Sequence, residues 1–88
     1  MQDYEYVWYI EHMKLSKSVK NQKYKIINID APDADLRSRF FQLGFNPGAS
    51  ILLKRKAPIF SDPLLFEIGE SQIALTKQEA SYILVEEV

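Results

Sequence analysis

Few side chains in this sequence have the chemistry of an active site. The 88-residue chain has no cysteine and a single histidine, His12. A chain without cysteine has no disulfides, no thiolate nucleophile and no cysteine-ligated zinc. The sequence also contains no H-E-x-x-H, Walker A or G-x-G-x-x-G motif. We therefore expect a protein that is not an enzyme.

Carboxylates and the single imidazole are the remaining candidate metal ligands. Ferrous iron commonly takes imidazole or carboxylate ligands, and Glu11 stands next to His12. The acids Asp30, Asp33, Asp35 and Asp62 are hard oxygen ligands, but a cap or a turn accounts for each of them. No cofactor is evident, and Glu11 and His12 are weak candidates for a site that binds Fe²⁺ or another divalent metal.

The densest run of positive charge is Lys54-Arg55-Lys56. A basic run near aromatic residues is typical of proteins that bind single-stranded RNA, and an RNA-binding small barrel is one alternative for this chain. The formal net charge is −1, however, and no pair of stacking aromatics is evident. We expect a solvated strand end and no nucleic-acid partner.

The length of the apolar runs and the composition of the first residues indicate where the protein is located. The longest apolar runs are far shorter than the roughly 20 residues that span a bilayer. The first residues, MQDYEYVWYIEH, contain acids where a signal peptide has a basic region. We expect a cytoplasmic protein that is not inserted in a membrane.

Short strands and one helix would position these side chains. Strands are expected over 23–30, 50–57, 64–68, 72–75 and 82–88, because apolar residues alternate in or dominate each segment. In the first, Tyr24, Ile26 and Asn28 share one face, and Ile27 and Ile29 share the other. In the second, Ile51 and Leu53 face inward, followed by Arg55 and Ala57.

Local chemistry marks the ends of the helical segments. In APDADLRSRFFQLG, Asp33 is a natural N-cap, and Gly44 follows the helix end, where a left-handed backbone favours glycine. Pro47 and Gly48 fit a type II turn. Thr76 and Glu79 have the spacing of a capping box and open a single helical turn. The fold expected is mainly β, a small closed or nearly closed barrel of about five strands. One short α-helix lies between the first two core strands, and the helical turn precedes the last strand.

The order of these motifs resembles the FeoA family, the small cytoplasmic component of bacterial ferrous iron uptake. The family pattern is R-L-x-x-L-G-F-x-P-G, a strand, R-x-A-P, a loop, D-P, a strand, I-A-L and E-A-x-x-I-x-V. The matching residues here, within about 14–87, are Arg39, Phe40, Leu43, Gly44, Phe45, Pro47, Gly48, Arg55, Ala57, Pro58, Asp62, Pro63, Ile73, Ala74, Leu75, Glu79, Ala80, Ile83 and Val85. In the family, the loop after Ala57-Pro58 is usually rich in glycine.

The resemblance implies an SH3-like β-barrel and a non-enzymatic role beside the FeoB-type ferrous iron permease, through the cytoplasmic region of that permease. The same barrel occurs as the C-terminal domain of iron- and manganese-dependent repressors. A free-standing SH3-like regulatory module that associates with a metal-responsive repressor is therefore the other alternative.

The outward side chains of the second and third strands are the candidate partner surface. Leu52 and Leu65 would be neighbours on one exposed face, with Phe60 at the tip of the hairpin and Lys54 and Lys56 beside them. Exposed apolar patches often mark partner sites. The alternative is a lid over them, formed by the aromatic residues of the N-terminal segment.

Residues 1–12 differ in composition from the rest. Tyr4, Tyr6 and Trp8 give them an aromatic, strand-like pattern, and Met13 is a second plausible start. We expect an atypical extension over 1–12 and the barrel domain over 13–88. An aromatic strand can also add to a sheet edge of a second molecule, so the extension is a candidate homodimer contact.

Overall fold

The computed structural model describes residues 12–88. Glu11 and the aromatic residues Tyr4, Tyr6 and Trp8 lie outside the described residues, as does the lid expected from them. The elements in chain order are β1 (Met13–Lys14), η1 (Leu15–Lys17), β2 (Lys23–Ile29), α2 (Ala34–Gln42), β3 (Ser50–Lys56), β4 (Leu64–Ile68), β5 (Ser71–Leu75), α3 (Lys77–Ala80) and β6 (Ile83–Glu87).

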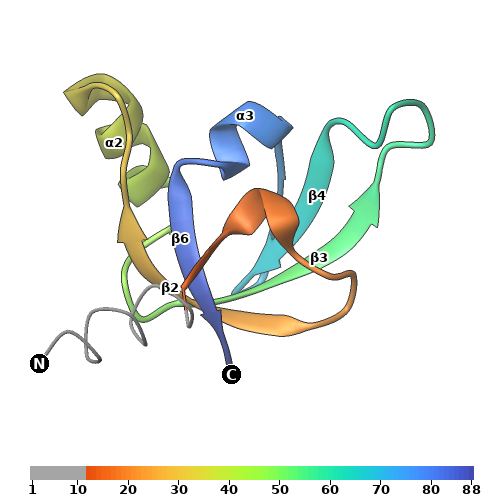
Figure 1. Ribbon diagram of the computed structural model, residues 1–88. Helices are drawn as coiled ribbons and strands as arrows, with labels where there is room; N and C mark the ends of the chain where they lie inside the picture. Colours follow the sequence, from red (N-terminus) through yellow and green to blue (C-terminus); the bar gives the residue numbers. More distant parts are fainter. Residues whose placement is uncertain (1–11) are drawn as a thin grey trace, which may run out of the picture.

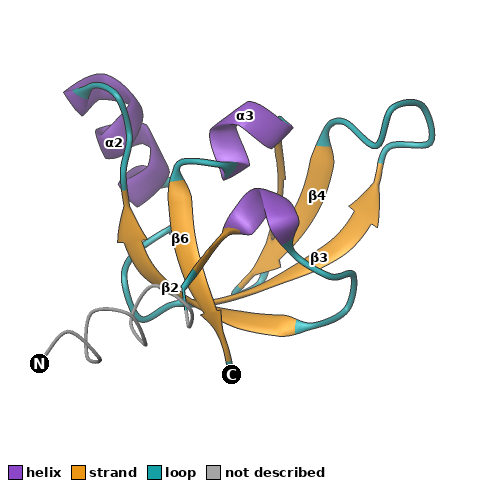
Figure 2. Ribbon diagram, in the orientation of Figure 1, coloured by secondary structure: helices purple, strands orange, loops and turns teal. Residues whose placement is uncertain are grey.

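One curved antiparallel sheet forms the body of the molecule (Figure 1). Its strand order is β1-β6-β2-β3-β4-β5. The short helix α3 contacts both β5, at one end of the sheet, and η1, which follows β1 at the other end. The edge strands β1 and β5 leave a gap in the barrel, and Figure 2 shows η1 and α3 next to each other there. The sheet is therefore a nearly closed barrel, and the expectation of a mainly β fold is confirmed.

The number of strands differs from the expectation of about five, because the described part of the chain has six. The additional strand is β1, in which Met13 pairs with Val85 and Lys14 with Leu84. Two residues with one apolar side chain give no alternation that could indicate a strand. Pairing with β6 makes the strand, and Leu15 directly after it is fully buried.

The core is made of the inward side chains of the strands and of residues that close the two ends. Its fully buried members are Leu15, Tyr24, Ile26, Ile29, Phe40, Phe45, Ile51, Leu53, Leu64, Phe66, Leu75, Ala80, Ile83 and Val85. Each strand from β2 to β6 contributes at least one of them. The sheet thus encloses a single core, as expected for a barrel of this size.

The expected division of β2 between its two faces is wrong at Ile29. Ile26 pairs with Val85 and Asn28 with Leu84, so Ile27 is an extra residue in β2 and forms a β-bulge. A bulge shifts the alternation by one residue. As a result, Ile29 joins Tyr24 and Ile26 in the core, and Asn28 is exposed.

The helix α2 begins and ends at the predicted residues. The Asp33 carboxylate accepts the Leu36 N–H at 2.8 Å. At the other end, Phe45 N–H donates to Phe40 O at 2.9 Å and Gly44 N–H to Phe41 O at 3.1 Å, the two bonds of a Schellman motif. Gly44 has φ 99°. The Phe40 and Phe45 rings meet edge to face with centroids 5.9 Å apart, so the helix end is fastened to the core.

The chain then turns directly into β3. Ala49 N–H donates to Asn46 O at 3.0 Å across Pro47 and Gly48, and Gly48 has φ 92°. This is the predicted type II turn. Before the last strand, Thr76 Oγ1 accepts the Glu79 N–H at 3.0 Å, and Glu79 Oε1 accepts the Thr76 N–H at 2.9 Å. The predicted capping box is formed.

Candidate partner-binding surface

The β3–β4 hairpin extends away from the barrel and ends in an apolar tip (Figure 1). Phe60 is 88% exposed and Ile59 is 68% exposed. The loop has a defined conformation, because Ala57 N–H donates to Pro63 O at 3.0 Å and Asp62 Oδ1 accepts the Lys77 N–H at 3.0 Å. The tip is therefore held out into solvent by contacts with its own base and with the start of α3.

A second β-bulge changes the outer face of this hairpin. Leu53 pairs with Phe66 and Arg55 with Leu65, so Lys54 is the extra residue. The expectation that Arg55 continues the inward face of Ile51 and Leu53 is wrong, because the bulge shifts the alternation. Arg55 is exposed and lies opposite Leu65, whose side chain points out of the barrel.

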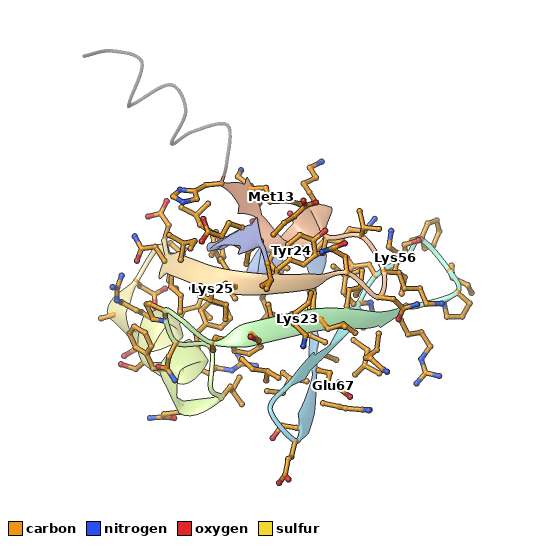
Figure 3. All side chains as sticks on the ribbon, turned by 90° about the horizontal axis from the view of Figure 1, so that it is seen from below. Met13, Lys23, Tyr24, Lys25, Lys56 and Glu67 are labelled. Carbon is orange, nitrogen blue, oxygen red and sulfur yellow. The ribbon has the colours of Figure 1, made fainter. Side chains whose placement is uncertain are left out.

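Leu52 and Leu65 do not form one exposed apolar face. Both are half-buried, and Leu52 lies opposite Glu67 instead of Leu65. Leu52 lines a hollow of about 240 Å³ between Lys23 and Glu67. Figure 3 looks onto this part of the sheet, with Lys23 and Glu67 labelled and Lys56 toward the hairpin loop.

Leu65 lines a different and smaller hollow, of about 170 Å³. Its lining is mainly apolar but includes two cations, Arg55 and Lys56. The other lining residues are Ala57, Pro58, Pro63, Leu65 and Ala74. The surface predicted from the sequence is thus divided into two shallow hollows and an apolar tip. Such shallow sites bind surfaces or extended segments better than they enclose a small substrate.

Positive charge gathers around the hairpin. Lys54, Arg55 and Lys56 lie on β3, and Lys77 begins α3 beside Asp62. Lys20 lies in the turn before β2, which Asn21 N–H fastens to Leu53 O at 2.9 Å. Within residues 12–88, none of these five cations forms an ion pair, since the ion pairs there are His12–Glu86 and Arg39–Glu79.

The metal candidates are only partly described. Glu11 lies outside the described residues. His12 Nε2 lies 3.6 Å from Glu86 Oε2 on β6, and its side chain is 9% exposed. In the described part of the chain, no three or more histidine, aspartate or glutamate side chains gather as a metal site would require. Residues 12–88 alone therefore do not fit a metal centre.

Sequence reasoning missed three residues of this surface. Ile59 is more exposed than Leu52 or Leu65. Val19 is 62% exposed in the turn beside Leu53. The backbone N–H of Lys77 donates to Asp62 in the hairpin loop. The pair Ile59-Phe60 between two prolines was the signal for the tip. No local signal connects Val19 or Lys77 to the hairpin, because both connections are long-range.

Fold and surface together define a class: a small SH3-like barrel whose described residues offer hollows and an apolar tip to a partner. The family model described as the FeoA domain matches residues 13–87. The chain belongs to the FeoA family.

Similar proteins agree with this assignment. The "Putative Fe(2+) transport protein A" of Helicobacter pylori strain J99 is 29% identical over 75 residues, which are 85% of this chain and 95% of that protein. The solution structure of iron(II) transport protein A from Clostridium thermocellum is 36% identical with a TM-score of 0.80, over 86% of this chain and 46% of that chain. The crystal structure of Stenotrophomonas maltophilia FeoA complexed with zinc, described as a procaryotic SH3 domain protein, is 26% identical with a TM-score of 0.75. It is matched over 84% of this chain and 89% of that chain.

The helices of the described residues are short. None of them is long and apolar enough to cross a membrane.

Proposed function

We propose that this protein is a non-enzymatic, cytoplasmic accessory of bacterial ferrous iron uptake that docks on the cytoplasmic region of a FeoB-type permease. The observation that carries the proposal is the FeoA family match over 13–87, which spans the whole barrel. The related proteins named for Fe²⁺ transport support the same pathway.

The β3–β4 hairpin is the surface that we assign to docking. Leu52 and Leu65 line its two hollows, and Phe60 is at the tip. Lys56 also lines the second hollow, and Lys54 is the bulge residue of β3. Half-buried leucines in shallow hollows can each receive one apolar side chain of a partner, and the cations add electrostatic attraction. A small contact of this kind favours reversible association.

A titration with the cytoplasmic GTPase region of a cognate permease tests the proposal. Amide shifts of the labelled full-length chain should concentrate at residues 52–66, and Leu52→Ser with Leu65→Ser should weaken binding about tenfold or more. Val88→Ser, which changes an exposed apolar residue elsewhere, is the matched control. Unchanged affinity of a folded double variant would exclude the two hollows, and an absence of shifts would argue against this partner.

Direct metal binding stays a prediction. The zinc in the Stenotrophomonas maltophilia structure makes it worth testing here, with Glu11 and His12 as the candidate ligands. Calorimetric titration with Zn²⁺ should show a weak site that His12→Ala removes. The same heat in both proteins would remove His12 from consideration.

A further inference from the structure

The exposed apolar residues of the described chain are not scattered. Only four large apolar side chains of residues 12–88 are classed as exposed: Val19 62%, Ile59 68%, Phe60 88% and Val88 72%. Val88 is the last residue. The other three lie in the β3–β4 loop and in the turn after η1, which Figure 1 shows on the same side of the molecule. This side is opposite α2 in Figure 1, and it is called the hairpin end below.

The hairpin end also carries cations from three separate elements. Lys20 comes from the turn, Lys54, Arg55 and Lys56 from β3, and Lys77 from the start of α3. Two hydrogen bonds hold these elements together: Asn21 N–H to Leu53 O at 2.9 Å and Lys77 N–H to Asp62 Oδ1 at 3.0 Å. Asp62 is the only acid in the 57–63 loop, and its carboxylate already accepts a backbone N–H.

We propose that the hairpin end docks on an anionic membrane surface, with Ile59 and Phe60 inserted at the headgroup boundary and the five cations against the lipid phosphates. Apolar side chains next to a basic surface are the combination that binds peripheral proteins to anionic bilayers. This inference goes beyond the proposed function and does not depend on it.

The shape of the tip fits the boundary of a lipid bilayer. Phe60 protrudes with almost all of its surface in water, and a bilayer boundary surrounds such a side chain on every side. The cations come from β3, from the start of α3 and from the turn before β2, and a layer of phosphates can attract cations from several segments at once. A net charge of −1 does not oppose the contact, because the attraction acts within about 8 Å at physiological salt.

Flotation of the full-length chain with vesicles gives the primary test. Vesicles of phosphatidylcholine with about a quarter phosphatidylglycerol should carry the protein, and pure phosphatidylcholine should carry much less. Ile59→Ser with Phe60→Ser should reduce binding about tenfold or more, since both inserted side chains are lost. Lys54→Gln with Lys56→Gln should reduce it by roughly fivefold for each cation removed.

Matched controls separate insertion from general effects. Val88→Ser changes an exposed apolar residue away from the tip, and Lys25→Gln removes an exposed cation on β2. Both variants should bind vesicles within about twofold of the natural chain. Any small decrease for Lys25→Gln would come from the lost long-range attraction of that cation. Amide spectra of each variant show that the barrel is folded.

A spectroscopic readout reports on the tip itself. Phe60→Trp in a Trp8→Phe background has a single tryptophan, whose emission should shift to the blue on anionic vesicles and be quenched by brominated lipid. An unshifted emission, or flotation that the serine variant leaves unchanged, overturns the insertion.

Two further outcomes assign the surface elsewhere. Salt-sensitive binding to poly(U) without flotation would indicate that the cations bind RNA, and it would overturn the proposal. Binding to the GTPase region without flotation would also overturn it, while the proposed function would stand. Conversely, flotation without binding to that region would support this inference and contradict the proposed partner.

Discussion

Gly44 shows how one residue fixes a junction between helix and strand. Its φ of 99° belongs to the left-handed region, and a Cβ built there meets nothing within 4 Å. Any cost of substitution therefore comes from the backbone alone. The two Schellman hydrogen bonds around it depend on that conformation.

We expect Gly44→Ala to lower the free energy of unfolding by about 1–2 kcal/mol, the cost of a left-handed backbone for an ordinary residue. Gly44→Asn should lose less, because asparagine tolerates this region better than alanine. Urea denaturation measures both. Equal losses in the two variants would mean that the strain is not the cause.

The residues at caps and turns were predictable from the sequence. The exposure of the candidate partner-binding residues was predictable only for some of them. The cap and turn hydrogen bonds around Asp33, Gly44, Gly48 and Thr76 close within a few residues, so one short stretch of sequence contains both partners of each bond. The half-burial of Leu52 depends on Lys23 and Glu67, which come from two other strands. Nothing local to Leu52 indicates these neighbours.

At the scale of elements, the two bulges explain the errors in the predicted faces. The strands β2 and β3 were predicted as strands, but an extra residue at Ile27 and another at Lys54 reverse the alternation beyond them. A bulge is defined by the register against a partner strand. The apolar run Ile26-Ile27 and the basic run that starts at Lys54 gave no sign of where the extra residue falls.

The link between the β3–β4 loop and α3 is a second feature of this scale. Asp62→Ala removes the acceptor of the Lys77 N–H, and we expect a loss of about 0.5–1.5 kcal/mol in the free energy of unfolding. Hydrogen exchange at the Lys77 amide should become faster. Asp62→Asn retains an acceptor oxygen and serves as the control. If Asp62→Ala leaves this amide protected, the hydrogen bond does not hold the loop.

At the scale of the molecule, β1 is the first strand of the described residues. Leu15 is fully buried, and η1 contacts α3 across the gap in the sheet. The boundary predicted at Met13 stays a prediction, although the family match also begins at residue 13. Removing a buried leucine alone costs about 2–5 kcal/mol, a large part of the stability of a small domain.

Two truncations test this boundary. A chain that begins at Met13 should remain folded and unfold cooperatively, whereas a chain that begins at Ser18 should lose its melting transition. Circular dichroism during heating measures both. A Met13 chain that fails to fold would show that residues before it belong to the barrel.

The uneven distribution of charge has a consequence for chromatography. The chain has a formal net charge of −1 and a pI of about 5.8, so its net charge alone predicts no retention on a sulfonate column at pH 7. A resin meets one end of a molecule at a time, and the end with Lys20, Lys54, Arg55, Lys56 and Lys77 presents cations without ion-pair partners among residues 12–88. We expect retention on the column above the pI, and earlier elution of Lys54→Gln with Lys56→Gln than of Lys25→Gln.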